Sequence, residues 1–229
     1  LAVGSWQLAV GSQLTVCCLP SAFCQLPSAV CLPPSAFRQL PPFKIMRIIS
    51  GEYRGRILKS PADNRTRPTS DRLRETLFNV LNPKIHSATR FLDLCAGTGA
   101  IGIEAISRGA GFAAFVDKSK RACALIEENL DLLKIPEEQT EIFNNTAEKF
   151  VAREPATAWD IVFYDPPYQD NYRVFLFEFA TRAEKLLTAE GILIVEHHAK
   201  NLLPDAVGDV RRWRILKQGE THLSFFQRN

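Results

Sequence analysis

A proline-rich turn holds the residues of this sequence that are best suited to chemistry. Asp165-Pro166-Pro167-Tyr168 follows an apolar run that is predicted to be a strand. The two prolines fix the backbone and have no amide donors, so the turn offers acceptors, namely the Asp165 carboxylate and the Pro166 carbonyl group. Tyr168 adds a flat face for stacking. This combination suits the exocyclic amino group of a planar ring, although an ordinary proline-rich turn is the alternative interpretation.

A glycine-rich segment forms the second candidate site. Residues 93–102 follow a predicted strand and open a predicted helix, and their glycines fall as GxGxxG at Gly97, Gly99 and Gly102. Glycines let a backbone turn tightly and approach a ligand closely. The spacing alone does not exclude a dinucleotide dehydrogenase. Asp93, however, precedes the loop, and a carboxylate there suits the ammonium group of an amino acid, as in S-adenosylmethionine, better than a pyrophosphate.

Two further strand ends carry polar residues. Asp117 ends the strand that follows, 24 residues after Asp93, where a carboxylate can accept hydrogen bonds from a ribose diol. The alternative is a helix cap before Lys120. Asn145 and Thr146 follow the third strand and could contact an adenine edge, or cap the short helix that begins at residue 147. These two interpretations stay open.

Apolar periodicity predicts an α/β protein. Short apolar runs alternate with segments of helical period from residue 90 onward, which is typical of a mostly parallel, doubly wound sheet. In such sheets, ligands bind beyond the carboxyl ends of the strands. The predicted strands are 90–94, 112–116, 141–143, 160–164 and 192–196, with an antiparallel C-terminal pair at 211–217 and 222–227. The predicted helices are 99–108, 120–133, 147–153 and 172–187, with an earlier helix capped at Thr69 or Ser70 and ending at Leu81.

The segment that precedes this body is basic. Residues 46–74 hold eight cations and three acids, and 75–229 carry a net charge of −4. Such asymmetry favours contact with a phosphate backbone, and a solvated basic face is the alternative. Residues 46–58 are predicted to form a hairpin around residues 51–55. We therefore expect an RNA-docking hairpin and helix over 46–84 and a catalytic domain over 85–229.

The first 45 residues differ in composition from the rest. They contain no acid, four of the six cysteines and short repeats such as LAVGS and LPSA. A signal peptide needs its basic residues at the start, a transit peptide would be richer in arginine, and the cysteine spacing does not match a zinc site. We interpret the segment as a low-complexity, unstructured leader or an over-extended gene model whose native start is Met46.

Composition excludes several classes of protein. A hydrophobic share of 46% and a charged share of 23% are ordinary for globular chains, and no run of about 18 apolar residues is present. The two remaining cysteines, Cys95 and Cys123, form no framework and fit a reducing, cytoplasmic setting. We expect no membrane partner and no metal, and we favour a monomer.

Five segments of the chain together resemble one family over residue 46 to about 227. DLCAGTGAIG and DPPY are similar to motifs I and IV of class I S-adenosylmethionine-dependent methyltransferases that act on amino groups. The opening segments are similar to those of the bacterial 16S ribosomal RNA (guanine-N2)-methyltransferase D family. These segments are MRIISGEYRGR and TRPTSDRLRE, at residues 46–56 and 66–75. IEAISRGA, at residues 103–110, is similar to the first helix of the same family. Ser50 departs from the usual glycine, and Thr146 from the usual Asp or Asn.

The resemblance implies a Rossmann-like methyltransferase fold with an N-terminal hairpin extension. It also implies transfer of a methyl group from S-adenosyl-L-methionine to N2 of a guanine in 16S rRNA, within an assembling small ribosomal subunit. The implied catalytic residues are Asp165, Pro166, Pro167 and Tyr168. The implied cofactor-binding residues are Asp93, Ala96, Gly97, Gly99, Asp117, Lys118, Asn145 and Thr146. The implied RNA-binding residues are Arg54, Arg56, Arg65, Arg67 and Arg72.

Two rival functions remain open at this point. An N-methyltransferase for DNA adenine or protein glutamine would use a similar turn, but glutamine enzymes usually carry Asn where this chain has Asp165, and residues 46–229 leave little room for a DNA target-recognition domain. A catalytically silent RNA-binding assembly factor on the same fold is the second rival. Damage to the glycine loop or the turn would favour it, and neither motif is damaged.

Overall fold

The computed structural model describes residues 46–61, 71–153, 155–167 and 171–229. The chain divides into two units, Leu1–Lys44 and Ile45–Asn229. The leader predicted over residues 1–45 lies outside the described residues, and so do the candidate site residues Arg65, Arg67 and Tyr168.

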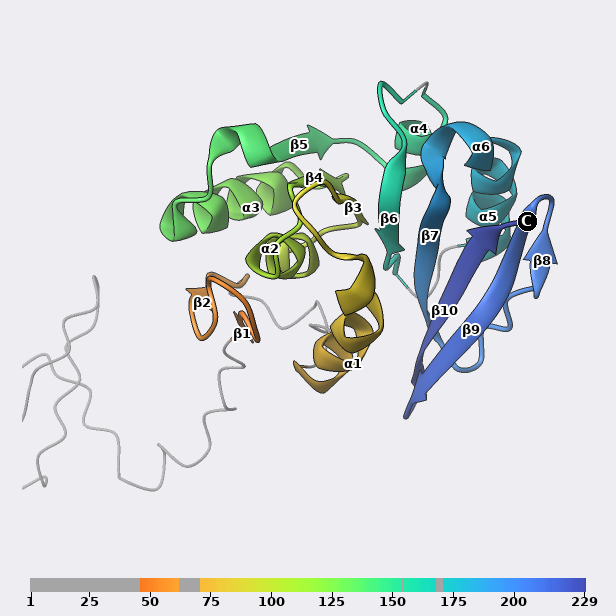
Figure 1. Cartoon of the computed structure of the whole chain (residues 1–229), viewed down its shortest axis with the longest axis horizontal. Coiled ribbons are helices and arrows are strands. Elements are labelled where there is room, and N and C mark those ends of the chain that lie inside the picture. The colour runs from red at the N-terminus through yellow and green to blue at the C-terminus, as the bar shows by residue number, and fades with distance from the viewer. Residues whose placement is uncertain (1–45, 62–70, 154, 168–170) are drawn as a thin grey trace, which may run out of the picture. The chain divides into compact units, whose positions relative to one another are not determined.

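An eight-stranded sheet forms the centre of the second unit (Figure 1), with strand order β5-β4-β3-β6-β7-β10-β9-β8. The first five strands in this order are parallel, and the last three join antiparallel. The fold class predicted from periodicity is confirmed, the predicted antiparallel C-terminal pair is present as β9 and β10, and β8 adds a further strand at the edge. The strands are β3 (Arg90–Leu94), β4 (Phe112–Asp117), β5 (Thr140–Asn144), β6 (Trp159–Tyr164), β7 (Leu187–His198), β8 (Ala206–Val207), β9 (Val210–Gln218) and β10 (Thr221–Arg228).

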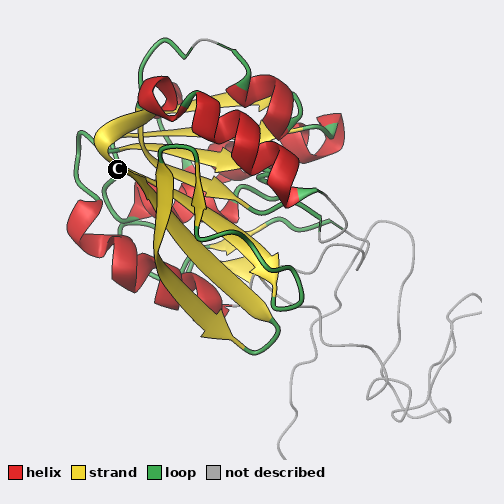
Figure 2. Ribbon diagram, turned by 90° about the vertical axis from the view of Figure 1, so that its right-hand side faces the viewer, coloured by secondary structure: helices red, strands yellow, loops and turns green. Residues whose placement is uncertain are grey.

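Helices cover both faces of the sheet (Figure 2). Successive strand residues point to opposite faces, so Phe91 packs in one apolar cluster and Leu92 in the other. The first cluster includes α1 (Asp71–Leu81), α2 (Ala100–Ser107) and α3 (Lys120–Leu133). The second includes α4 (Ala147–Val151), α5 (Tyr172–Thr181) and α6 (Ala183–Leu186). Two 3₁₀ turns are also described, η2 (Asn82–Lys84) and η3 (Glu137–Gln139).

The predicted helix over residues 172–187 is wrong in its length. The helix breaks at Arg182, whose φ of −122° leaves the helical region, and α6 ends at Leu186. The strand predicted to begin at residue 192 begins at Leu187 instead, because Leu187 pairs with Trp159 of β6. Gly191 lies at the irregularity that follows, where an added Cβ would approach the Trp159 carbonyl oxygen to 2.9 Å. Gly191 therefore permits a bulge and does not end a helix.

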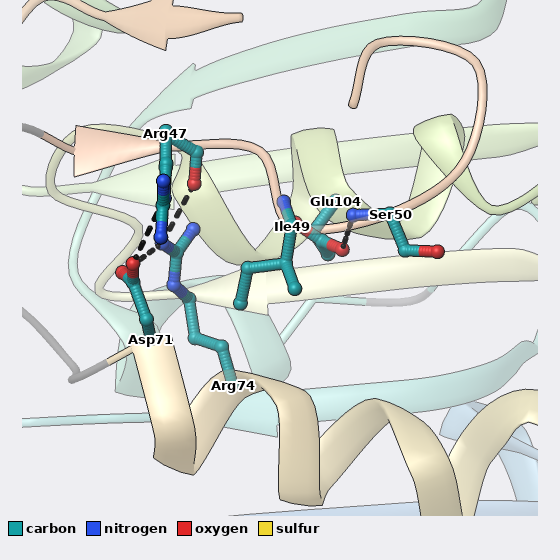
Figure 3. Close-up of polar contacts among 6 residues, drawn as sticks. All are labelled: Arg47, Ile49, Ser50, Asp71, Arg74 and Glu104. Carbon is teal, nitrogen blue, oxygen red and sulfur yellow. Dashed lines mark hydrogen bonds and ion pairs between the residues drawn. The ribbon is translucent and has the colours of Figure 1, made fainter. Parts of the chain in front are cut away.

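The predicted N-terminal hairpin is present and is held against α2. Strands β1 (Met46–Arg47) and β2 (Ile57–Leu58) pair antiparallel. The buried Glu104 carboxylate of α2 accepts the amide hydrogens of Ile49 and Ser50 at 2.8 and 3.0 Å (Figure 3). Gly51, with φ of +85°, passes so close to α2 that a Cβ would overlap the Ser107 carbonyl oxygen. Only glycine fits this approach.

A buried arginine joins α1 to the same hairpin. Arg74 donates from Nη2 to the Arg47 carbonyl oxygen at 2.7 Å and to the Asp71 carboxylate at 2.9 Å (Figure 3). Arg74 is fully buried, so it serves packing and not solvent-side recognition. Within the described ranges, no helix combines the length and the apolar character needed to cross a membrane.

Candidate active site

The carboxyl ends of β3, β4, β5 and β6 bring the predicted site segments together. Backbone hydrogen bonds link them across the sheet. The Ala96 amide donates to Val116, the Asn145 amide to Asp117, and the Asp165 amide to Leu94, at 3.1, 3.0 and 3.4 Å. The glycine loop, the polar segment after β5 and the proline turn therefore share one edge of the sheet, as parallel topology requires.

The glycine loop follows β3 in an alternating conformation. Cys95, Gly97 and Gly99 all have positive φ, at 64°, 58° and 76°, and Gly99 caps the N-terminus of α2. A Cβ added at Gly97 would meet no protein atom within 4 Å. The loop therefore presents open space over a bare backbone beside a helix N-terminus, which is the geometry that close ligand approach requires.

Asp93 is a buried carboxylate beneath this loop. Its residue is only 2% exposed, and Oδ2 accepts the Gly102 amide hydrogen at 3.0 Å, which fixes the first turn of α2. Burial raises the pKa of Asp93 to about 8, and the nearby charges of Asp165 and Asp117 act in the same direction. An extra negative charge is thus costly here, which favours a cationic ligand.

Asp117 binds two backbone amides at the end of β4. Oδ2 accepts from Gly97 at 2.9 Å and Oδ1 from Ser119 at 2.8 Å. The helix-cap interpretation of Asp117 is wrong, because Ser119 caps α3 and accepts the Ala122 amide hydrogen at 3.3 Å. The Asp117 carboxylate instead ties the glycine loop to the next strand, while Lys118 beside it is exposed.

The sequence left two roles open for the residues after β5, a helix cap and a contact with adenine, and the structure treats Asn145 and Thr146 differently. Thr146 caps α4 by accepting the Lys149 amide hydrogen at 3.3 Å, so the cap interpretation is confirmed for Thr146. Asn145 accepts the Thr146 amide hydrogen through Oδ1 at 3.0 Å. Its Nδ2 is buried without a hydrogen-bond partner among the described residues. Such a donor usually finds a partner, and a bound ligand is one candidate.

The proline turn is anchored from below. The Tyr164 ring, one residue before the turn, stacks on Phe175 of α5 with centroids 3.6 Å apart. Pro166 is buried and Pro167 exposed. Asp165 is half-buried by surface area, yet its carboxyl group lies deep enough that burial raises its pKa to about 7. The Asp165 carboxyl group therefore changes its protonation state near neutral pH.

The three carboxylates of Asp93, Asp117 and Asp165 form no ion pair with any described residue. Where the chain is described, no group of three or more His, Cys, Asp or Glu is arranged to hold a metal ion. The site thus combines unpaired acids, a bare backbone loop and an orphan amide donor. An amino-acid-bearing nucleoside with a cationic centre fits these three features.

Sequence reasoning missed Asn129. This fully buried residue of α3 accepts the Lys59 amide hydrogen at 2.7 Å. Its Nδ2 donates to the Lys59 and Thr98 carbonyl oxygens at 3.2 and 3.0 Å. Asn129 thus joins the segment after the hairpin to the glycine loop. Its place on the apolar side of the predicted helix was the available signal, because a buried amide needs partners.

We expect Asn129→Leu to lower the free energy of unfolding by about 2 kcal/mol, because the part-buried Lys59 amide and Thr98 carbonyl oxygen would lose their hydrogen-bond partner. Urea unfolding measures this loss. Leu132→Ala, which changes an exposed residue of the same helix, is the control and should change stability little. If Asn129→Leu lowers the free energy of unfolding no more than Leu132→Ala does, the hydrogen bonds of Asn129 do not stabilise the fold.

Three of the predicted RNA-binding residues are described. Arg54, Arg56 and Arg72 are exposed and form no ion pair with another described residue. Other cations of the same segment are paired internally. Arg47 and Arg74 contact Asp71, and Lys59 contacts Glu128 at 2.9 Å.

Comparison with known proteins identifies the family. The family model described as conserved hypothetical protein 95 matches residues 46–227. Ribosomal RNA small subunit methyltransferase D of Escherichia coli is 36% identical over 80% of this chain and 90% of its own length. The chain belongs to the methyltransferase D family. The putative rRNA methyltransferase YlbH of Bacillus subtilis is 34% identical over 80% of this chain and 99% of its own.

Solved structures agree with this family. A putative methyltransferase from E. coli, yhhF, superimposes with a TM-score of 0.70 at 34% identity, covering 81% of this chain and 98% of its own. A putative methylase from Haemophilus influenzae gives a TM-score of 0.67 at 30% identity, covering 80% and 98%. The methyltransferase D resemblance found in the motifs and the Rossmann-like fold are both confirmed.

Proposed function

We propose that this chain transfers a methyl group from S-adenosyl-L-methionine to the exocyclic N2 of one guanine in 16S ribosomal RNA during assembly of the small subunit. The observation that carries the proposal is the position of the Asp165 turn beside the glycine loop, where the Asp165 amide bonds Leu94 at the end of β3. An acceptor pair for an amino group thus adjoins a loop suited to an amino-acid nucleoside. Membership of the methyltransferase D family supports both the amino-group substrate and the cofactor.

The described residues fit the cofactor. Gly97 leaves space for its amino-acid part, and the unpaired Asp93 carboxylate favours its ammonium group. We assign Asp117 to the ribose hydroxyls and the orphan Asn145 amide to the adenine edge. Ala96 and Gly99 shape the loop, Lys118 borders it and Thr146 holds the turn before α4. When bound, the cofactor supplies the electrophilic methyl group.

In the proposed mechanism the chain mainly positions the amino group. The guanine must leave its stack to enter the pocket. The Asp165 carboxylate and the Pro166 carbonyl oxygen then accept the two N2 hydrogens, which orients the nitrogen lone pair. Pro167 keeps the turn rigid, and Tyr168 stacks on the base. Positioning of this kind lowers the barrier, and the Asp165 charge stabilises the positive charge that develops on N2. As N2 gains the methyl group it gives up one of its two hydrogens as a proton, which the Asp165 carboxylate accepts and passes to solvent.

The basic entry segment supplies the proposed contact with RNA. Arg54, Arg56 and Arg72 are exposed and unpaired within the described residues, and Arg65 and Arg67 lie in the same stretch of sequence. Ribosomal subunits of bacteria assemble in the cytoplasm, so we propose that location for the reaction, with 16S rRNA or an assembling subunit as the partner.

Labelled S-adenosylmethionine and small-subunit particles without guanine-N2 methylation test the proposal. The protein is incubated with both, and the RNA is digested to nucleosides. Label in N2-methylguanosine is the expected result. Label in another nucleoside, or only in DNA adenine or protein glutamine offered in parallel, would replace the guanine assignment. Cofactor binding without transfer to any of these would favour another amino substrate, and neither binding nor transfer would favour a silent assembly factor.

We expect RNA binding to weaken as salt rises, and the double variant Arg54→Gln/Arg56→Gln to reduce this salt dependence. Each lost phosphate contact lowers the slope of log K against log salt by about 0.7–0.9. Filter binding of a 16S rRNA fragment at several salt concentrations measures the slope. Lys134→Gln, an exposed cation at the far end of α3, is the control. An unchanged slope in the double variant would remove the hairpin from the RNA surface.

A further inference from the structure

Strand β9 carries a concentration of positive charge that the proposed site does not use. Its nine residues include four cations and no acid. Arg212 pairs with Asp205. The other cations have no ion pair or side-chain hydrogen bond with any described residue, and they are Arg211, Arg214 and Lys217. The neighbouring acids, Asp209 and Glu220, lie beyond the two ends of the strand.

A bulge in β9 presents a tryptophan at the surface. The pairing of β9 with β10 shifts between Phe225 and Phe226, which face Arg214 and Arg212, so Trp213 is the extra residue. Bulges of this kind re-aim a side chain. The Trp213 ring rests on Phe225 with centroids 5.7 Å apart and still leaves the residue 46% exposed. Trp213 is thus a supported aromatic surface that faces solvent.

The tryptophan and two of the cations share one face of the sheet. Phe225 belongs to the apolar cluster that α1 and the hairpin also join. Arg214 pairs directly with Phe225, and Arg211 pairs with Gln227 two residues further along β10. Because opposed residues in an antiparallel pair point to the same face, both arginines lie on the Trp213 side. Figure 1 shows α1 between the hairpin and the β9–β10 pair on this face.

We propose that Arg211, Trp213 and Arg214 form a second RNA-contact surface, which binds single-stranded nucleotides of the substrate away from the hairpin. This inference rests on the proposed function. Exposed aromatic rings between cations bind single strands, since bases stack on the ring and phosphates pair with the cations. Three strand spacings, or about 14 Å across the sheet, separate β9 from β6, and the surface lies one to four residues along β9 from Ile215, which is in register with Tyr164. One RNA segment can therefore engage both the surface and the pocket.

Edge protection is the competing explanation. Strand β8 pairs only with Val210 and Arg211, so the rest of β9 lies at the edge of the sheet, and charges with a bulge discourage pairing between edges. Edge protection accounts for the cations and the bulge. It does not account for a large aromatic ring held half-exposed between them, because an apolar side chain favours association.

Steady-state methylation of the small-subunit particle tests the inference with Trp213→Ala, Trp213→Phe and Arg211→Gln/Arg214→Gln. We expect Trp213→Ala to raise KM for the particle about tenfold with an unchanged cofactor Kd, because the variant loses the stacking of one base on the ring. Trp213→Phe should recover most of this loss. The variant Arg211→Gln/Arg214→Gln should reduce the slope of log KM for the particle against log salt by about 1.4, which is about 0.7 for each lost contact with a single-strand phosphate.

The controls separate the possible outcomes. Leu132→Ala and Arg153→Gln change an exposed apolar residue and an exposed cation elsewhere and should leave KM and slope unchanged. If wild-type protein transfers methyl groups and the β9 variants match these controls, the RNA surface is overturned, and aggregation of the arginine pair would then support edge protection. If wild type transfers nothing, the proposed function itself fails. If Trp213→Ala does not fold, the variants Trp213→Phe and Arg211→Gln/Arg214→Gln still test the RNA surface.

Discussion

Asp165→Ala and Asp165→Asn are expected to lower the rate of methyl transfer by about 10³-fold while the cofactor Kd stays near that of wild type. The alanine variant loses the acceptor and its charge. The asparagine variant keeps an oxygen but loses the charge that stabilises the developing cation on N2, an effect of roughly 10²–10³ for a single preorganised group. Single-turnover transfer of label to small-subunit particles measures the rate, and calorimetry of cofactor binding measures the Kd.

The Asp165→Asn variant should also be more stable than wild type at neutral and higher pH. Burial raises the pKa of Asp165 from 3.8 to about 7, so the folded protein binds a proton that the unfolded chain releases. Wild-type stability contributed by this proton is complete below pH 3.8 and falls as pH rises toward 7. The Tm advantage of the variant should therefore grow between about pH 4 and 7 and then level off.

Asp131→Asn, which changes an exposed carboxylate on α3, is the matched control and should leave rate and Tm unchanged. Full activity in either Asp165 variant would contradict the proposed mechanism. Loss of activity together with loss of cofactor binding would instead give Asp165 a structural role in the cofactor pocket. A variant that is less stable at pH 8 would contradict the cost assigned to burying this carboxylate.

The backbone of the site was predictable because local sequence rules determine it. Strand ends followed by glycine or proline turns specify where ligands bind in a parallel sheet, and the order of strands and helices specified the sheet. Gly97 and Asp165 were placed at one edge of the sheet in this way. The end of the helix before β7 was not predicted correctly. Leu187 fits the helical periodicity, but it pairs with Trp159 as a strand residue, and periodicity carries no information about this tertiary contact.

Long-range polar contacts account for most of the remaining differences. Glu104 lies in an apolar helix, and only the folded chain shows that its carboxylate binds the hairpin amides of Ile49 and Ser50. Counting cations likewise gave no means of separating Arg74, which is buried, from Arg72, which is exposed. Similarly, Ser119 and not Asp117 caps α3. In each case the folded chain, and not the local sequence, shows which residue is buried or hydrogen-bonded.

Gly97→Val is expected to weaken binding of S-adenosyl-L-methionine at least about 100-fold. The glycine has φ of +58°, and the space that its Cβ would enter holds no protein atom, so a branched side chain there would occupy the proposed cofactor volume. The left-handed conformation adds a folding cost of about 1–2 kcal/mol, which by itself does not affect affinity. Calorimetry of cofactor binding, with thermal unfolding alongside it, measures both effects.

Gly219→Val separates strain from blockage. Gly219 lies in the turn between β9 and β10 with φ of +59°, and its Cβ would also meet no protein atom within 4 Å. Both variants therefore carry the same backbone cost, and only Gly97→Val places atoms in the candidate cofactor site. Equal losses of stability with an affinity loss confined to Gly97→Val would support the assignment. Equal affinities in the two variants would show that the cofactor does not approach the backbone at Gly97, and the glycine loop would then need another ligand to explain its shape.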